Sequence, residues 1–425
     1  MAPSAQSRHR TASRTPRSVR IAATVVAAAL PVTAVAVSLD GGTPGATASP
    51  APAAPATGPA VINDAFPTRD AADTDTYVPS DESVWRDAVY DDAGNRLPNV
   101  EELEVHSPAM DRDIPVVTIR AKEDAANAPT IYLLNGADGG SGKANWLSQT
   151  TAIDFYGNRI GNVNVVIPMS GGFSYYTDWQ QESVLDGDGN GNGNGGVQKW
   201  ETFLTSELPG AMEQGHLGTS SDKRAIVGMS MTGSTSLVYA EHNPGMYDAV
   251  GSYSGCPATS GAGATAVDAT LAMKGTGVTY EQMWRDRNGA TARYNDAQVN
   301  VAELGDQQNI YVSSGTGLLG EHDVWSSPDV NRNLINESTV AGQGSPIEAV
   351  TNGCTHMFKA AADKAGVSDN ITWNFHNTGT HQWAYWREDM YQSWPTLSAG
   401  LFGPESVAYA QAVGDQAYDD YHASL

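Results

Sequence analysis

Basic residues are scarce in this chain of 425 residues. It holds 24 lysines and arginines against 48 aspartates and glutamates, which gives a net charge of −24. Five of the arginines lie within the first twenty residues, so the rest of the chain carries 19 basic residues against the same 48 acidic ones, a net charge of −29. A body this acidic argues against binding to nucleic acid or to an anionic membrane surface, because both are themselves negatively charged.

Long apolar runs are also rare, and one near the N-terminus stands out. Residues 21–37 form a stretch of 17 residues rich in alanine and valine, after a basic segment at residues 8–20. Small residues follow at 34–36 and 46–48. This order predicts an exported chain with a signal peptide over residues 1–38. An uncleaved membrane anchor is the alternative, although the stretch is short for a span. No later segment approaches that length.

Cysteine is limited to two residues, Cys256 and Cys354. In an exported protein an even number of cysteines predicts a disulfide. The bond would close a loop of roughly 100 residues and stabilise the fold by up to about 4–5 kcal/mol in the chain-entropy model. Two buried free thiols are the alternative.

The rest of the chain divides by composition. Residues 39–80 are rich in Ala, Pro and Gly and predict a disordered linker. One large domain is expected over residues 81–405, followed by a C-terminal tail at residues 406–425. Its pattern predicts a hairpin around residues 107–113, a helix at 200–208 and buried strands at 130–134, 163–168, 225–228, 249–254, 309–313 and 371–375. Alternating strands and helices predict an α/β fold with a mostly parallel central sheet and helices on both faces.

Residues 186–196 alternate Asp or Asn with Gly, which is typical of the start of a calcium-binding loop. The twelfth position of that loop is Val197, where a bidentate glutamate is needed, and long flanking helices are absent. We therefore interpret the segment as a flexible surface loop and predict neither a metal site nor a cofactor.

A serine lies at the turn between a predicted strand and a predicted helix. Residues 228–233 read Gly-Met-Ser-Met-Thr-Gly, so Ser230 follows the strand and precedes a helix that ends before Asn243 and Pro244. Such a turn presents a hydroxyl at a helix N-terminus, where free backbone N–H groups can stabilise an oxyanion. A serine that merely caps the helix is the alternative.

A serine nucleophile needs a histidine base and an acid that orients it. In α/β-hydrolases the chain order is serine, acid, histidine. His381 follows the last predicted strand and opens an aromatic-rich helix, whereas His376, beside that strand, is the weaker candidate. The residue pattern alone leaves the acid open among Glu321, Asp323 and Glu348.

These motifs resemble the secreted mycolyltransferases of the antigen 85 type and their corynebacterial relatives, which are α/β-hydrolases. The resemblance runs over residues 100–400. The matching residues, in order, are Ser107, Pro108, Met110, Arg112, Asp113 and Ile114, then Tyr132, Leu133, Leu134 and Gly136, then Asn145, Trp146, Tyr176, Thr177, Asp178 and Trp179, then Lys199, Trp200, Glu201, Thr202, Phe203 and Leu204, then Gly228, Met229, Ser230, Met231, Gly233 and Ser234, and finally Gly379, Thr380, His381, Trp383, Tyr385 and Trp386.

The resemblance implies roles for individual residues. In that family the acid is a glutamate on the segment leading to a helix that ends in Ala-Gly, which points to Glu348, with Glu321 and Asp323 as alternates. It also implies that the backbone N–H groups of Met231 and Ala137 bind the oxyanion. The corynebacterial-type relatives resemble this chain in carrying a cysteine pair at these places.

The resemblance further implies a transferase that passes a mycoloyl group through a Ser230 acyl-enzyme. The expected donor is trehalose monomycolate and the expected acceptor is a second trehalose monomycolate or cell-wall arabinogalactan, a glycolipid or polysaccharide of the cell envelope. Substrate contacts are expected from Asn135, Gly136, Asp138, Gln382 and Trp383. The family's Asp-Gly-Leu-Arg is Asn-Gly-Ala-Asp at residues 135–138 here, and the residue after the histidine is Gln382 instead of serine.

Two other functions fit the same residues. One is a secreted carboxylesterase that uses the same triad with water as the acceptor, and the other is a surface binding protein. In each case we expect a protein that is secreted or held in the cell envelope, with membrane contact only through an uncleaved N-terminal segment.

Overall fold

The computed structural model describes residues 58–63, 84–91, 93–185, 196–275, 277–330 and 340–424, all of which belong to the unit Ala48–Leu425. The predicted signal peptide at residues 1–38 and the glycine-rich segment up to residue 195 lie outside these ranges. Among the helices described, none is long and apolar enough to cross a membrane.

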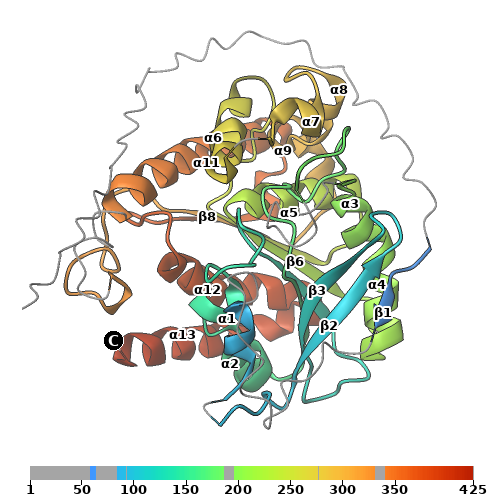
Figure 1. The fold of residues 1–425 in the computed structure, drawn as a ribbon. Helices are drawn as coiled ribbons and strands as arrows, with labels where there is room; N and C mark the ends of the chain where they lie inside the picture. The colour runs from blue at the N-terminus through green and yellow to red at the C-terminus, as the bar shows by residue number, and fades with distance from the viewer. Residues whose placement is uncertain are drawn as a thin grey trace, which may run out of the picture. The chain divides into compact units, whose positions relative to one another are not determined.

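A single mixed sheet runs through the described residues (Figure 1). Its spatial order is β1-β2-β3-β5-β4-β6-β7-β8-β9. The strands are β1 Val61–Asn63, β2 Val100–Ser107, β3 Arg112–Ile119, β4 Thr130–Leu134, β5 Asn164–Pro168, β6 Arg224–Met229, β7 Ala249–Tyr253, β8 Ile310–Ser314 and β9 Ile371–Phe375. The first three are antiparallel to their neighbours, and β5, β4, β6, β7, β8 and β9 pair in parallel. The predicted hairpin and mostly parallel sheet are confirmed.

The helices and helical turns fill the connections between these strands. They are η1 Val84–Val89, α1 Trp146–Gln149, α2 Ala152–Asp154, η2 Phe155–Ile160, α3 Trp200–Thr202, η3 Phe203–Glu207, α4 Leu208–Gly210, η4 Ala211–Leu217, α5 Met231–His242, η5 Gly261–Gly263, α6 Ala264–Lys274, α7 Tyr280–Trp284, α8 Ala290–Tyr294, α9 Ala297–Asn300, η6 Val301–Gly305, η7 Pro328–Val330, η8 Val340–Gly344, α11 Ser345–Ala365, η9 Ser368–Asn370, α12 Trp383–Phe402, η10 Pro404–Ser406 and α13 Val407–Ser424. The predicted helix at residues 200–208 is confirmed by α3, η3 and the start of α4.

Helices cover both faces of the sheet, as the alternation of strand side chains requires. Ile226 belongs to the apolar cluster that includes Leu237 of α5, whereas its neighbour Val227 belongs to the cluster that includes Trp394 of α12. Figure 1 shows α5 and α11 on one side of the strands, and α12 and α13 on the other. The fold is that of an α/β-hydrolase.

Two segments outside the expected 81–405 domain are part of this body. β1 lies in the range expected to be linker and pairs with β2, with Ile62 opposite Val105. The range expected to be a C-terminal tail forms α13, which buries Ala410 and Ala417. Gly414 lets α13 approach α12, because a Cβ there would lie 2.7 Å from the carbonyl oxygen of Tyr391. The ordered body therefore extends beyond both expected limits.

The turn between β6 and α5 depends on two glycines without room for a side chain. A Cβ on Gly228 would lie 2.0 Å from the carbonyl oxygen of Thr232, and one on Gly233 would lie 2.9 Å from the Cα of Gly255. The first glycine lets the strand meet the first turn of its helix, and the second lets α5 meet the segment after β7.

Gly228→Ala is expected to lower the free energy of unfolding by about 3 kcal/mol, the upper end of overpacking costs, because backbone atoms must move. Urea unfolding measures this difference. Gly210→Ala is the matched control: a Cβ at Gly210, in α4, has no neighbour within 4 Å, so this change should leave stability unchanged or raise it by up to about 1 kcal/mol. Equal stability of the two variants would show that the close approach at Gly228 is not required.

Candidate active site

Ser230 lies at the end of β6 and caps the N-terminus of α5. Its backbone has φ 57° and ψ −121°, a positive φ that is uncommon for a residue with a side chain and marks a strained turn. The Ser230 N–H donates to the carbonyl oxygen of Tyr253 at 2.8 Å, which holds the turn against the end of β7. The strained conformation turns the hydroxyl away from the sheet.

His381 brings its imidazole to that hydroxyl from the loop between β9 and α12. Its Nε2 lies 2.7 Å from the Oγ of Ser230, and its Nδ1 lies 2.7 Å from the Oε2 of Glu348. The His381 backbone N–H donates to the carbonyl oxygen of Gly344 at 3.2 Å. The loop is thus docked at the start of α11, the helix that carries Glu348.

Glu348 lies in the first turn of α11, and none of its surface is exposed. Its Oε1 accepts hydrogen bonds from the hydroxyl of Ser254 at 2.8 Å, the hydroxyl of Ser314 at 3.2 Å and the backbone N–H of Gly315 at 2.6 Å. Burial alone would raise the pKa of Glu348, but the hydrogen bond and charge of His381, with the bonds from Ser254 and Gly315, lower that pKa below its ordinary value. The carboxylate is therefore ionised at neutral pH and orients the His381 Nδ1–H.

The structure separates the other candidates from this set. Glu321 is exposed, and the buried Asp323 accepts hydrogen bonds from the hydroxyls of Thr380 and Tyr385, both at 2.6 Å. Asp323 therefore supports the loop around His381 without contacting its ring. Of the three acids left open by the sequence, Glu348 is the one brought to His381.

His376, the weaker candidate base, pairs with Asp389 through a 3.0 Å contact. Burial alone would lower the pKa of His376, but Asp389, with further contributions from Glu388 and Glu348, raises it to about 9. At neutral pH this imidazole is protonated and cannot accept a proton.

The two backbone N–H groups that the resemblance assigns to the oxyanion belong to Met231 and Ala137. Met231 opens α5 directly after Ser230, and Ala137 lies in the loop after β4. Within the described part of the chain, neither N–H has a hydrogen-bond acceptor. Gly136 brings the second group close, because a Cβ there would lie 2.9 Å from the sulfur of Met229 and 3.7 Å from the Cβ of Ser230.

Asn135 differs from its expected role as a substrate contact. Its side chain is fully buried, its Nδ2 donates to the carbonyl oxygen of Pro168 at 3.0 Å, and its Oδ1 accepts from the backbone N–H of Trp146 at 3.1 Å. Both ends of the amide are occupied, so Asn135 anchors the loop that carries Ala137.

The other expected substrate contacts lie nearer the surface. Asp138 is half-buried and its carboxylate accepts the backbone N–H of Gly140 at 3.0 Å, while burial raises its pKa. Gln382 and Trp383 are half-buried at the start of α12. Trp146 and Trp179, two of the residues that match the family, are both buried.

A disulfide joins Cys256, after β7, to Cys354, later in α11. The predicted bond is thus present. The hydroxyl of Thr355, also in α11, donates to the carbonyl oxygen of Gly255 at 3.3 Å. The hydroxyl of Ser234 in α5 donates to the carbonyl oxygen of Cys256 at 2.8 Å. The bridge therefore ties the helix of Glu348 to the helix that follows Ser230.

Sequence reasoning missed the hydroxyls of Ser254 and Ser314, which hold the Glu348 carboxylate. A signal for them was available, because each lies at the C-terminal end of a predicted parallel strand, β7 or β8. The sequence offered Asp323 only as a candidate acid. Its contacts with Thr380 and Tyr385 could not be predicted, because they form only when distant segments fold together.

Comparison with known proteins finds similar chains. The family model described as "Putative esterase" matches residues 107–397. The "Diacylglycerol acyltransferase/mycolyltransferase Ag85A" of Mycobacterium leprae is 31% identical over 309 residues, which are 71% of this chain and 83% of that protein. The Ag85B protein of Mycobacterium avium, with the same descriptive name, is 28% identical over 307 residues, 71% of this chain and 83% of that protein. Among solved structures, MPT51 (FbpC1) of Mycobacterium tuberculosis has a TM-score of 0.51 at 22% identity, covers 75% of this chain and 99% of its own, and supports the fold.

Glu348→Gln should destabilise the protein in a pH-dependent manner. The pKa of Glu348 is lowered on folding from an ordinary value of 4.5, so its ionised form stabilises the native state above about pH 4.5 and loses this effect as the pH falls through the folded pKa. Urea unfolding should therefore show a stability gap between wild type and variant that is largest near pH 7 and narrows below about pH 4.5. The exposed Glu303→Gln serves as control and should show no such gap. A gap independent of pH would contradict the assigned cause.

Proposed function

This chain belongs to the putative esterase family, and on that premise we propose that it is a serine acyltransferase that moves a mycoloyl group from trehalose monomycolate to a second trehalose monomycolate or to cell-wall arabinogalactan. Its relationship to acyltransferases and esterases makes it an enzyme of the serine hydrolase type. The observation that carries the proposal is the continuous hydrogen-bonded series from the buried Glu348 through His381 to Ser230.

In the first half of the proposed reaction, Ser230 becomes acylated. Its Oγ attacks the ester carbonyl carbon of the donor while its proton passes to the Nε2 of His381. The tetrahedral intermediate then breaks its bond to the sugar oxygen, which takes the proton from His381 and leaves as free trehalose. Glu348 keeps the imidazole in the required tautomer and stabilises its positive charge.

In the second half, the acyl group leaves the enzyme. An acceptor hydroxyl gives its proton to His381 Nε2 and attacks the acyl carbonyl carbon. The bond to Ser230 Oγ breaks, and the serine regains its proton from the imidazole. No cofactor takes part in either half.

The oxyanion of each tetrahedral intermediate is assigned to the N–H groups of Met231 and Ala137. Support comes from the place of Met231 directly after Ser230, from the closeness of Gly136, the neighbour of Ala137, to Ser230, and from the lack of another acceptor for either N–H among the described residues. Each such donor contributes roughly 3–4 kcal/mol of transition-state stabilisation in serine hydrolases. Because both belong to the backbone, they are in place before substrate arrives.

Sugar recognition is assigned to Asp138, Gln382 and Trp383. Within the described residues, Asp138 forms no ion pair with a basic side chain, and its Oδ1 accepts the Gly140 N–H, so its second oxygen is available to a sugar hydroxyl. Gln382 can donate and accept hydrogen bonds with hydroxyls, and the half-buried ring of Trp383 offers an apolar face. The acceptor site therefore recognises hydroxyl groups through hydrogen bonds, without the arginine that the antigen 85 relatives have at the position equivalent to Asp138.

We propose that the enzyme acts outside the cell or in the cell envelope.

A secreted carboxylesterase is the second candidate, because the same residues hydrolyse the acyl-enzyme when water takes the place of the acceptor. The two differ in how well the site excludes water. A surface binding protein remains the third candidate, and it makes no use of the Ser230 hydroxyl.

The acceptor assay separates these functions. Purified protein is incubated with trehalose monomycolate, with and without added acceptor, and the products are identified by mass spectrometry together with the adduct on Ser230. We expect trehalose dimycolate or the acylated acceptor, and an added acyl mass on Ser230. Free mycolic acid as the sole product would establish the esterase, and an unmodified Ser230 with no product would leave only the binding protein.

Ser230→Ala and Glu348→Gln should both reduce acyl transfer, measured under conditions where circular dichroism shows each variant to be folded. The first removes the nucleophile and should abolish the acyl-enzyme. The second leaves the imidazole without its charged partner and should lower kcat on the order of 10⁴-fold, as the loss of a triad carboxylate does in other serine enzymes. Ser220→Ala and Glu303→Gln, at exposed positions, are the matched controls. Full activity of Glu348→Gln, with loss in Glu321→Gln instead, would assign the acid elsewhere.

A further inference from the structure

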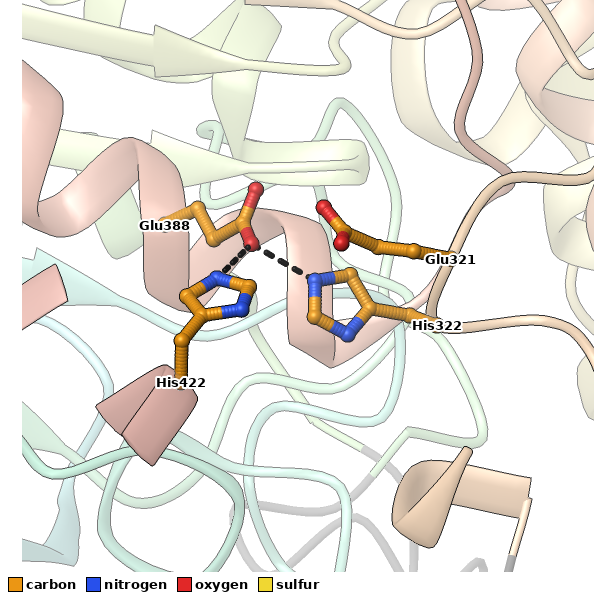
Figure 2. Close-up of side chains that lie close together, drawn as sticks. All are labelled: Glu321, His322, Glu388 and His422. Atoms are coloured by element: carbon orange, nitrogen blue, oxygen red, sulfur yellow. Dashed lines mark hydrogen bonds and ion pairs between the residues drawn. The ribbon is translucent and has the colours of Figure 1, made fainter. Parts of the chain in front are cut away.

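A second group of ionisable side chains lies away from Ser230, where three distant segments meet. Glu321 and His322 come from the loop after β8, Glu388 comes from α12, and His422 comes from the last turn of α13. One potential ligand atom from each residue lies within 4.8 Å of those of the other three. Figure 2 shows the four side chains converging on one point, with the Glu388 carboxylate between the two imidazoles.

The contacts within this group are short and directed. The Oε1 of Glu388 lies 2.6 Å from the Nε2 of His322 and 2.9 Å from the Nε2 of His422. His322 and Glu388 are buried, with 2% and 5% of their surface exposed, whereas His422 is half-buried and Glu321 is exposed. The group is therefore enclosed on one side and reachable from solvent on the other.

The second nitrogen of His322 is held by another carboxylate. Its Nδ1 lies 2.8 Å from the Oδ2 of Asp329. The Oδ1 of Asp329 accepts from the guanidinium of Arg387 at 3.0 Å and from the hydroxyl of Tyr421 at 3.1 Å. The 2.6 Å contact with Glu388 places a proton between that carboxylate and the Nε2 of His322. A metal ion would displace this proton, and with the Nδ1–H donated to Asp329 the Nε2 lone pair would then be directed into the group. A carboxylate on the far nitrogen is the arrangement that orients metal-binding histidines in proteins.

The balance of charge also calls for a cation. The Glu321 carboxylate faces that of Glu388, and among the described residues it forms no ion pair with a basic side chain. Glu388 is paired with the two imidazoles, so Glu321 is the carboxylate of this group that lacks a positive partner. A divalent cation at the point of convergence would supply that positive charge and take the Nε2 atoms of both histidines as ligands in place of their protons.

We propose that Glu321, His322, Glu388 and His422 bind one divalent transition-metal ion of the zinc class. Two imidazoles and two carboxylates match the nitrogen and oxygen ligands and the fourfold coordination that zinc takes in proteins. Calcium and magnesium are disfavoured because they prefer oxygen ligands alone. The site was not expected from the sequence, since His322, Glu388 and His422 are separated by 66 and 34 residues.

The bound ion would have a structural effect, because its ligands join α13 to α12 and to the loop after β8. That loop also carries Asp323, which supports Thr380 and Tyr385 on either side of His381. His322 itself packs edge-on against Tyr385, with ring centroids 5.1 Å apart. The inference is independent of the acyl-transfer reaction, so its test measures metal binding and not activity.

Zinc alone is the probe for this site. The full chain is stripped with a chelator, dialysed and titrated with zinc in a calorimeter, and the bound metal is counted by elemental analysis. We expect one zinc ion per chain and a higher thermal midpoint of unfolding with zinc present. His422→Gln should lose this binding, whereas His356→Gln, which removes an exposed imidazole on α11, should retain it.

Substitution at the outer carboxylate gives a test that does not depend on a ligand variant folding. Asp329→Asn can still accept the Nδ1–H bond and should weaken zinc binding by about 10–100-fold, the usual effect of losing such a carboxylate. Cobalt(II) in place of zinc should give the intense visible bands of a four-coordinate ion in the wild type. The proposal is overturned if the stripped wild type binds no stoichiometric zinc, or if His422→Gln and Asp329→Asn bind zinc as the wild type does; in that case the group is an ion-pair network only.

Discussion

The buried, ionised carboxylate of Glu348 is the interaction on which the geometry of the site depends. A carboxylate removed from water costs several kcal/mol unless hydrogen bonds and charge compensate it. Here the compensation comes from Ser254 at the end of β7, from Ser314 and Gly315 at the end of β8, and from His381 after β9. Three consecutive parallel strands must therefore end at the same level for α11 to place Glu348 without penalty. The register of these strands consequently also determines the alignment of the His381 imidazole.

The elements of the fold were largely predictable, because buried parallel strands are short apolar runs that end at turn residues. Ser230 and His381 were found for the same reason, since each follows such a run. The acid was different: Glu321, Asp323 and Glu348 all lie in the right interval, and what distinguishes Glu348 is the set of donors that folding brings to it. Pattern alone could not supply this, and the choice rested on a family resemblance that the structure's geometry matches.

Other features could not be foreseen because their partners lie far away in the chain. β1 has only three residues, too few to form a recognisable pattern, and it becomes a strand through its pairing with β2. α13 buries little beyond Ala410, Gly414 and Ala417, so its sequence reads as polar until α12 is placed beside it. An asparagine after a strand can contact either substrate or protein, and only the folded loop shows that Asn135 contacts protein.

Helix α12 and the disulfide together define how the site is held. α12 carries Glu388 and Asp389 as neighbours: one meets His322 and His422, and the other meets His376 and Tyr311. The bridge between Cys256 and Cys354 acts from the opposite face, on α11. Cystine bonds persist in oxidising surroundings and are rare where glutathione keeps thiols reduced. The rigidity of the segment that holds Ser230 beside His381 and Glu348 is thereby linked to the redox state of the surroundings, because the bridge persists only where thiols are not kept reduced.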